Sequence, residues 1–143
     1  RDRRGLDMKL PKKIVRVRDV MKTEVAIVDG MLTVSEALMS MEHPETRTLI
    51  VEKRHEDDEY GVVMLGDIAK KVLAHDLAPD RVNIYEIMSK PVLSVEPDMD
   101  IRYCTRLFES FGLSRAPVVE NKKIVGLVSY TDIVLKGLLG EQG

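Results

Sequence analysis

Three polar residues near the C-terminal end of the chain have the types and the spacing for ligand chemistry. Ser129, Thr131 and Asp132 follow an apolar, strand-like stretch and begin a helix-like one. A helix that starts there leaves backbone N–H groups unpaired and points the positive end of its dipole outward, which favours a phosphate. The carboxylate of Asp132 can accept hydrogen bonds from two vicinal hydroxyls, so it suits a ribose diol.

The same residues also fit a purely structural interpretation. Ser129 and Asp132 form a Ser-x-x-acid pattern, in which the serine caps a helix and the acid interacts with the helix dipole. Spacing alone gives the two interpretations about equal support, so both stay open at this point.

The segment that contains Asp132 occurs twice in the chain. Gly61–Ile68 recurs as Gly126–Ile133, and upstream Asp19–Met21 pairs with Glu86–Met88 in the same order. A long period that carries whole strand and helix units indicates duplicated supersecondary units. The two copies predict a pseudo-symmetric pair.

Each copy predicts the same order of elements, β-α-β-β-α, which places the chain in the α+β class. Thr33 and Glu36 form a capping box at the start of the first long helix. In the second copy, apolar residues at helical spacing predict the buried face of a helix: Ile101, Cys104, Phe108 and Phe111. The expected strands are 25–28, 48–52, 60–65, 93–95, 116–120 and 123–129, and the expected later helices are 67–75, 101–111 and 131–139.

The predicted domain boundaries follow the repeat. They comprise a mobile basic tail over 1–13, a first unit over 14–75, a linker over 76–83, a second unit over 84–139 and a short tail over 140–143. Each half alone offers a marginal core, so the two units are expected to share one interface.

Composition excludes several classes of function. The 143 residues carry 22 basic and 24 acidic side chains, a formal net charge of -2, so no overall charge draws the chain to nucleic acid or to an anionic membrane. Apolar runs are too short for a membrane helix, and we expect a soluble, cytoplasmic protein. The single cysteine, Cys104, lies on an apolar face and is expected to be a buried small hydrophobe rather than a nucleophile. Neither a metal cluster nor a catalytic constellation stands out, so no enzyme activity is expected.

These motifs together resemble the tandem cystathionine-beta-synthase-type domain pair, known as the CBS pair or Bateman module. The Asp-Val-Met and Glu-Ile-Met segments, Arg-Ala-Pro-Val-Val and Gly-Leu-Val-Ser-Tyr-Thr-Asp-Ile carry the resemblance, which covers roughly 15–139. It implies two units packed sheet to sheet about a pseudo-twofold axis, with two clefts that can hold adenosine-containing ligands. It also implies frequent dimerisation of the pair.

The resemblance assigns residues to a principal cleft. Asp132 takes the ribose, Ser129 occupies the family's Ser/Thr position, and Thr131 adds a second hydroxyl. Arg115 matches a position that often approaches phosphates, and its guanidinium fork fits that geometry. The apolar wall for a base is expected from Pro91, Val92 and Pro117.

The first copy departs from this pattern. Met64 and Gly66 stand where the second copy has Ser129 and Thr131, while Asp67 is retained. We therefore expect a second, weaker cleft with Asp67, Arg47 and Thr23, which binds weakly, has altered selectivity or binds nothing.

Two functions from different classes remain after this reading. The leading one is a non-catalytic sensory module that needs no cofactor and binds AMP, ADP, ATP, NAD or S-adenosylmethionine as a regulatory ligand, signalling through homodimer geometry or an effector protein. The alternative is a ligand-independent dimerisation and interaction scaffold.

Overall fold

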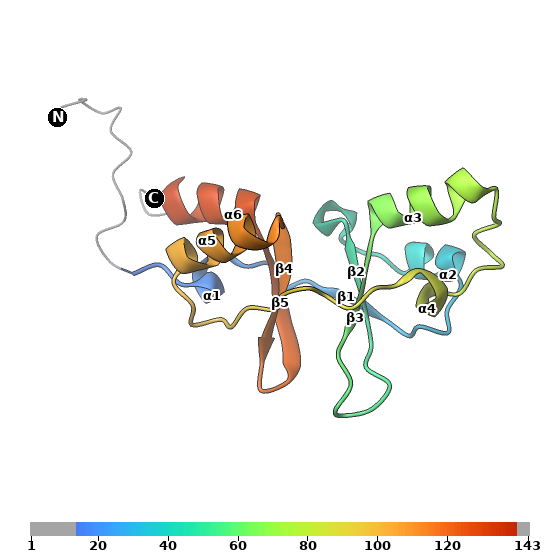
Figure 1. Ribbon diagram of the computed structural model, residues 1–143, viewed down its shortest axis with the longest axis horizontal. Coiled ribbons are helices and arrows are strands. Elements are labelled where there is room, and N and C mark those ends of the chain that lie inside the picture. The colour runs from blue at the N-terminus through green and yellow to red at the C-terminus, as the bar shows by residue number, and fades with distance from the viewer. Residues whose placement is uncertain (1–13, 140–143) are drawn as a thin grey trace. The chain divides into compact units, whose positions relative to one another are not determined.

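The computed structural model describes residues 14–139, which fold into two compact units of mixed helix and strand. One unit comprises Glu24–Val92, and among the described residues the other combines 14–23 with 93–139 (Figure 1). The α+β class is thus confirmed.

The 24–92 unit has a three-stranded sheet in the order β1-β2-β3. β1 and β2 run parallel, and β2 pairs antiparallel with β3, so that Thr48 lies opposite Met64 and Val51 opposite Gly61. All four residues of β2 are buried, as expected for the central strand of a covered sheet. The elements in order are β1 (Ala26–Val28), α2 (Val34–Met39), η2 (Pro44–Thr46), β2 (Thr48–Val51), β3 (Gly61–Met64), α3 (Leu65–Lys71), η3 (Leu73–His75) and α4 (Ile84–Ile87).

The other unit is built on an antiparallel hairpin. Asn121 and Lys122 both have positive φ, 53° and 66°, which is the backbone that a tight two-residue hairpin turn requires. The elements are α1 (Val17–Val20), α5 (Ile101–Phe111), β4 (Arg115–Glu120), β5 (Lys123–Ser129), α6 (Tyr130–Val134) and the π-helical segment η4 (Leu135–Leu139).

Two sequence expectations about this unit were wrong in detail. The strand expected at 93–95 is reduced to one parallel bridge between Val95 and Val118, because Pro97 has no N–H with which to continue the ladder. The side chain of Phe111 is 51% exposed although it lies on the apolar side of α5, because the helix ends there and Gly112 turns the chain away at φ 67°.

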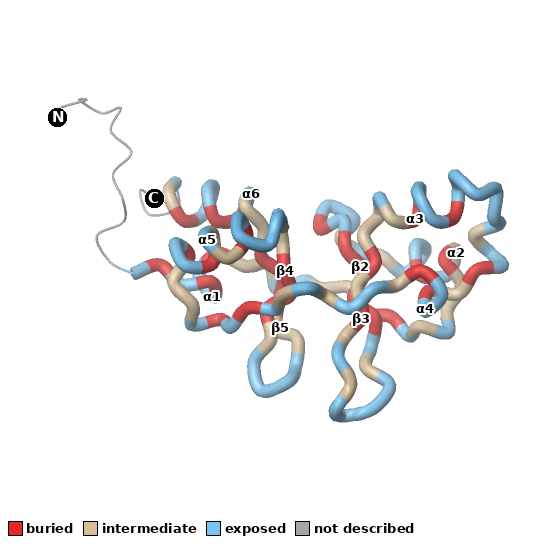
Figure 2. Tube along the Cα trace, viewed as in Figure 1, coloured by how far each residue is buried: buried red, intermediate tan, exposed pale blue. Residues whose placement is uncertain are grey.

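Each unit has its own hydrophobic core (Figure 2). In one, Phe108 is fully buried and meets the ring of Tyr130 edge to face, with centroids 5.3 Å apart. In the other, Leu49 and Val51 of β2 pack with Val34, Val63 and Ile84, all fully buried.

The two copies exchange their leading segments. α1 belongs to the first copy, yet Val17 and Val20 are buried in the core that contains Phe108. α4 opens the second copy, yet Ile84 and Ile87 are buried in the core of the 24–92 unit. The compact units are therefore cut differently from the repeat boundaries 14–75 and 84–139.

The exchanged segments pack against the two repeated glycines, Gly61 and Gly126. A Cβ on Gly126 would lie 2.6 Å from the carbonyl oxygen of Lys22 and 2.8 Å from Sδ of Met21, and a Cβ on Gly61 would lie 2.6 Å from Sδ of Met88. The glycine of one copy and the methionine of the other thus fit together, which links the two motifs of the repeat physically.

Candidate functional site

Ser129 and Asp132 form a reciprocal capping box at the start of α6. The Asp132 N–H donates to Ser129 Oγ at 3.2 Å, and Asp132 Oδ2 accepts from the N–H of Ser129 at 3.2 Å and from its hydroxyl at 3.0 Å. Ser129 and Asp132 therefore cap the helix, as the structural interpretation predicts.

Lys22 completes the environment of Asp132 from the exchanged leading segment. Its ammonium Nζ donates to Asp132 Oδ1 at 2.7 Å, and the two side chains are 33% and 5% exposed. A carboxylate this deeply buried is costly unless it is paired, and Lys22 supplies the counter-charge. Sequence reasoning missed Lys22 because it lies 110 residues from its partner.

Arg115 and Ser129 lie directly opposite each other in the β4–β5 pair. Directly opposed residues direct their side chains to the same face of the sheet, so the half-buried Arg115 is placed beside the capping box. Thr131 is exposed on the first turn of α6, and Pro117 is buried in β4.

The remaining predicted residues are distributed differently. Pro91 and Val92 fall in the 24–92 unit, whereas Thr23 falls in the unit that contains Asp132. The structure thus brings five of the seven residues predicted for the principal cleft into one unit, namely Asp132, Ser129, Thr131, Arg115 and Pro117. Thr23, predicted for the cleft of Asp67, lies at the end of the exchanged leading segment, next to Lys22.

The corresponding site around Asp67 is more open. Asp67 Oδ2 accepts from the Met64 N–H at 2.9 Å, and within residues 14–139 no Lys or Arg side chain forms an ion pair with it. Arg47 has a left-handed backbone, with φ 58°, and its carbonyl oxygen accepts from the Leu65 N–H at 3.1 Å. Its side chain is exposed at the same end of the sheet.

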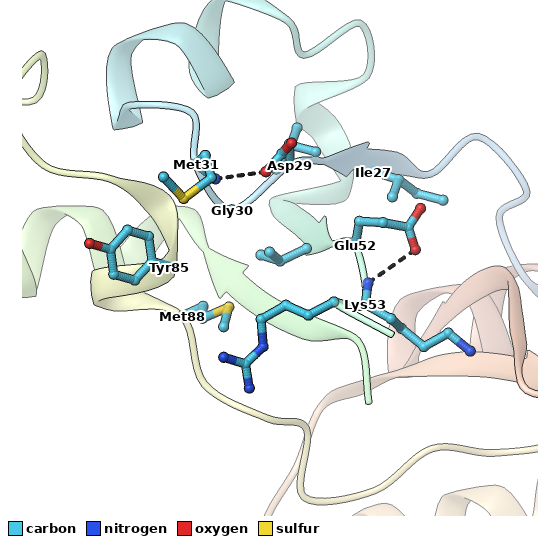
Figure 3. A pocket seen from close by; sticks show the side chains of 11 residues that line it. Ile27, Asp29, Gly30, Met31, Glu52, Lys53, Tyr85 and Met88 are labelled. Carbon is cyan, nitrogen blue, oxygen red and sulfur yellow. Dashed lines mark hydrogen bonds between the residues drawn. The ribbon is translucent and has the colours of Figure 1, made fainter. Parts of the chain in front are cut away.

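A cavity of about 860 Å³ lies at the other end of the same sheet (Figure 3). It adjoins Val28 and Val51, the carboxyl ends of the parallel pair β1 and β2, and thus lies away from Asp67. Sequence reasoning missed it, although polar or glycine residues directly after parallel strands are a known signal. Its lining residues include Ile27, Asp29, Gly30, Met31, Tyr85 and Met88.

Cys104 behaves as a buried hydrophobe. The side chain is fully buried, and burial raises the pKa of its thiol to about 11, which disfavours the reactive thiolate. Across residues 14–139 no group of three or more His, Cys, Asp or Glu side chains is arranged to hold a metal ion. None of the helices formed by these residues has the length and apolar character to cross a membrane.

Comparison with known proteins decides the family. Residues 17–74 and 84–137 each match the CBS domain. The chain belongs to the CBS domain family. The two matches are in tandem, so the chain carries a CBS domain pair, a regulatory kind of module.

Two curated relatives show how far the match of this CBS pair extends. An uncharacterised protein of Methanopyrus kandleri is 32% identical over 122 residues, which cover 84% of this chain and 61% of that protein. A Bacillus subtilis protein described as CBS domain-containing is 26% identical over 87% of each. The chain spans about three fifths of the length of the first curated relatives, 61% and 62%.

Solved structures support the same fold. A hexameric CBS-CP12 protein from bloom-forming cyanobacteria has a TM-score of 0.80 at 37% identity, covering 92% of this chain and 77% of that one. A CBS domain pair solved in complex with 5′-methylthioadenosine and S-adenosyl-L-methionine has a TM-score of 0.72 at 23% identity, covering 92% and 100%. The second likeness supports the fold alone.

Proposed function

We propose that this CBS pair is a non-catalytic regulatory module that binds an adenosine-containing ligand beside Asp132. The observation that carries the proposal is the β4–β5 register, which sets Arg115 opposite Ser129, the residue that caps the helical turn containing Asp132. A cation, hydroxyls and a carboxylate in that arrangement are the groups that a phosphorylated ribose requires.

Side chains, rather than the helix dipole, support this site. The α-helical part of α6 has five residues, so its macrodipole is short and contributes little. Ser129 and Thr131 supply hydroxyls, and Arg115 supplies a guanidinium.

A titration with AMP, ADP, ATP, NAD and S-adenosylmethionine tests the proposal. We expect at least one of them to bind and to raise the melting temperature by mass action. Asp132→Asn should weaken binding at least tenfold, whereas Asp67→Asn should leave it nearly unchanged. The reverse pattern would place the principal site in the 24–92 unit, and a flat response to every ligand would contradict the ligand function.

One observation favours the alternative of a ligand-independent scaffold. Lys22 and Ser129 already satisfy the Asp132 carboxylate without any ligand, as a purely structural cap would require. A flat ligand response together with a stable homo-oligomer in analytical ultracentrifugation would favour that alternative. We propose a homodimer as the basic assembly of the module, and the same measurement tests it.

A further inference from the structure

Lys22 occupies a position at which the two copies differ chemically. Lys22 and Ser89 each follow the methionine of a leading segment, and each forms an antiparallel bridge to β5 or β3, with Leu127 and Val62 respectively. The equivalent positions thus carry an ammonium beside Asp132 and a short hydroxyl in the unit of Asp67.

We propose that Lys22 is an anion-binding residue that makes the Asp132 site selective for ligands with a phosphate next to the ribose. This inference rests on the proposed function of that site. In the structure the ammonium donates to Asp132 Oδ1 and balances its charge. In the occupied site the ribose hydroxyls take Asp132 Oδ1, and the ammonium moves to the phosphate.

The backbone of Lys22 is fixed while its ammonium can move. Its N–H donates to the Leu127 carbonyl at 2.8 Å, its carbonyl accepts from the Leu127 N–H at 2.9 Å, and Gly126 packs against that same carbonyl. The side chain has a flexible four-carbon stem and is one third exposed. The ammonium can therefore leave Asp132 without displacing α1 from the core.

Charge balance gives the selectivity. Asp132 is almost fully buried, so exchanging an ammonium for neutral hydroxyls removes its counter-charge and leaves Lys22 without an anion. A ligand with a phosphate supplies a new anionic partner for Lys22. Arg115 lies on the same face of the hairpin as Ser129, so that its guanidinium can contact the same phosphate. A neutral adenosine compound offers no such replacement.

Calorimetric titration with AMP and with 5′-methylthioadenosine tests the inference, because the second probe lacks the phosphate. We compare the wild type with Lys22→Ser, which installs the residue of the other copy, and with Lys22→Arg, which keeps the cation. Lys123→Ser, an exposed substitution at the far end of β5, controls for net charge. All titrations share one ionic strength, since screening alters such contacts.

Lys22→Ser should weaken AMP binding roughly tenfold, the loss of one charge-assisted contact, and leave 5′-methylthioadenosine binding equal or tighter. Lys22→Arg should keep most of the preference for AMP, and Lys123→Ser should change neither affinity. If Lys22→Ser does not fold, Lys22→Gln removes the charge and keeps a donor for Asp132.

Three results would overturn the inference. Equal changes for both probes, or no change for either, would show that Lys22 is a structural partner of Asp132 and would leave the ligand function intact. AMP binding that depends on Asp67 and not on Asp132 would move the site away from Lys22. Failure of both probes and of the other adenosine ligands to bind the wild type would contradict the proposed function itself.

Discussion

Among single residues, Asp58 organises the long loop between β2 and β3. Its carboxylate accepts from the Arg54 N–H at 3.0 Å and from Lys90 Nζ at 3.1 Å. The backbone hydrogen bond from Arg54, followed by the one from Lys90, holds the pKa of Asp58 well below its ordinary value.

Asp58→Asn should therefore lower stability in a pH-dependent way. A depressed pKa in the folded state contributes stability above the ordinary Asp value near 3.9, and that contribution is lost as the pH falls toward the folded-state pKa. The difference between wild type and variant, measured by urea unfolding, should be full at pH 7 and shrink steadily below about pH 4. Glu56→Gln, the same charge change in the same loop, is the control. A difference that stays constant down to pH 2 would contradict this role.

The residues around Asp132 show how far sequence reasoning reaches. Ser129 and Asp132 were recognisable because they lie three residues apart and a capping box is a local pattern. Lys22 was not, because tertiary structure alone brings it to Asp132. Thr23 was predicted for the first cleft from chain order, and the exchanged segment carries it into the unit of Asp132.

At the scale of elements, the packing of the leading segments against β3 and β5 depends on two glycines. Gly126 faces a backbone carbonyl, whereas the nearest atom to Gly61 belongs to a flexible methionine side chain. Backbone cannot yield as a side chain can, so an added methyl group has different consequences at the two positions.

Gly126→Ala should therefore destabilise the protein by about 3 kcal/mol and Gly61→Ala by only about 1 kcal/mol, the ends of the usual range for overpacking. Gly66→Ala is a control of opposite sign, because nothing lies within 4 Å of its added Cβ and the residue sits in helix α3. It should stabilise by about 0.5 to 1 kcal/mol. Chemical denaturation of the three variants measures the change in the free energy of unfolding for each. Equal losses of stability for Gly61→Ala and Gly126→Ala would contradict the difference in packing at the two positions.

Elements with strong local signals were predicted well and those without them were not. The capping box of α2 and the β4–β5 hairpin appear close to where the sequence places them. The strand expected at 93–95 had apolar composition but lacked hydrogen-bonding capacity at Pro97. The cavity beside Tyr85 was missed because its walls come from three separate segments of the chain.

At the scale of the whole molecule, the exchanged segments make each unit depend on both copies. Neither core is complete within one repeat, since α1 and α4 each fill the core of the other copy.

Separately expressed fragments 14–83 and 84–139 should therefore be largely unfolded alone and should gain structure on mixing. Val17 and Val20 are at most 1% exposed in the intact protein. Fragment 14–83 contains these valines without the core that buries them, and fragment 84–139 contains that core without the valines. Circular dichroism and amide exchange of each fragment and of the mixture measure this. An independently folded fragment 84–139 would contradict it, and the uncut chain 14–139 is the control.

The exchange of leading segments also determines the order in which the two units can fold during synthesis. During synthesis the unit that ends at Val92 can close as soon as that residue clears the ribosome, and it needs nothing made later. The α1 segment was translated earlier but must wait, with its valines exposed to water, until Phe108 and the strands beyond it have been made. The apolar residues of α1 are thus made before the 24–92 unit but buried after it, and during that interval they are exposed to chaperones and to aggregation.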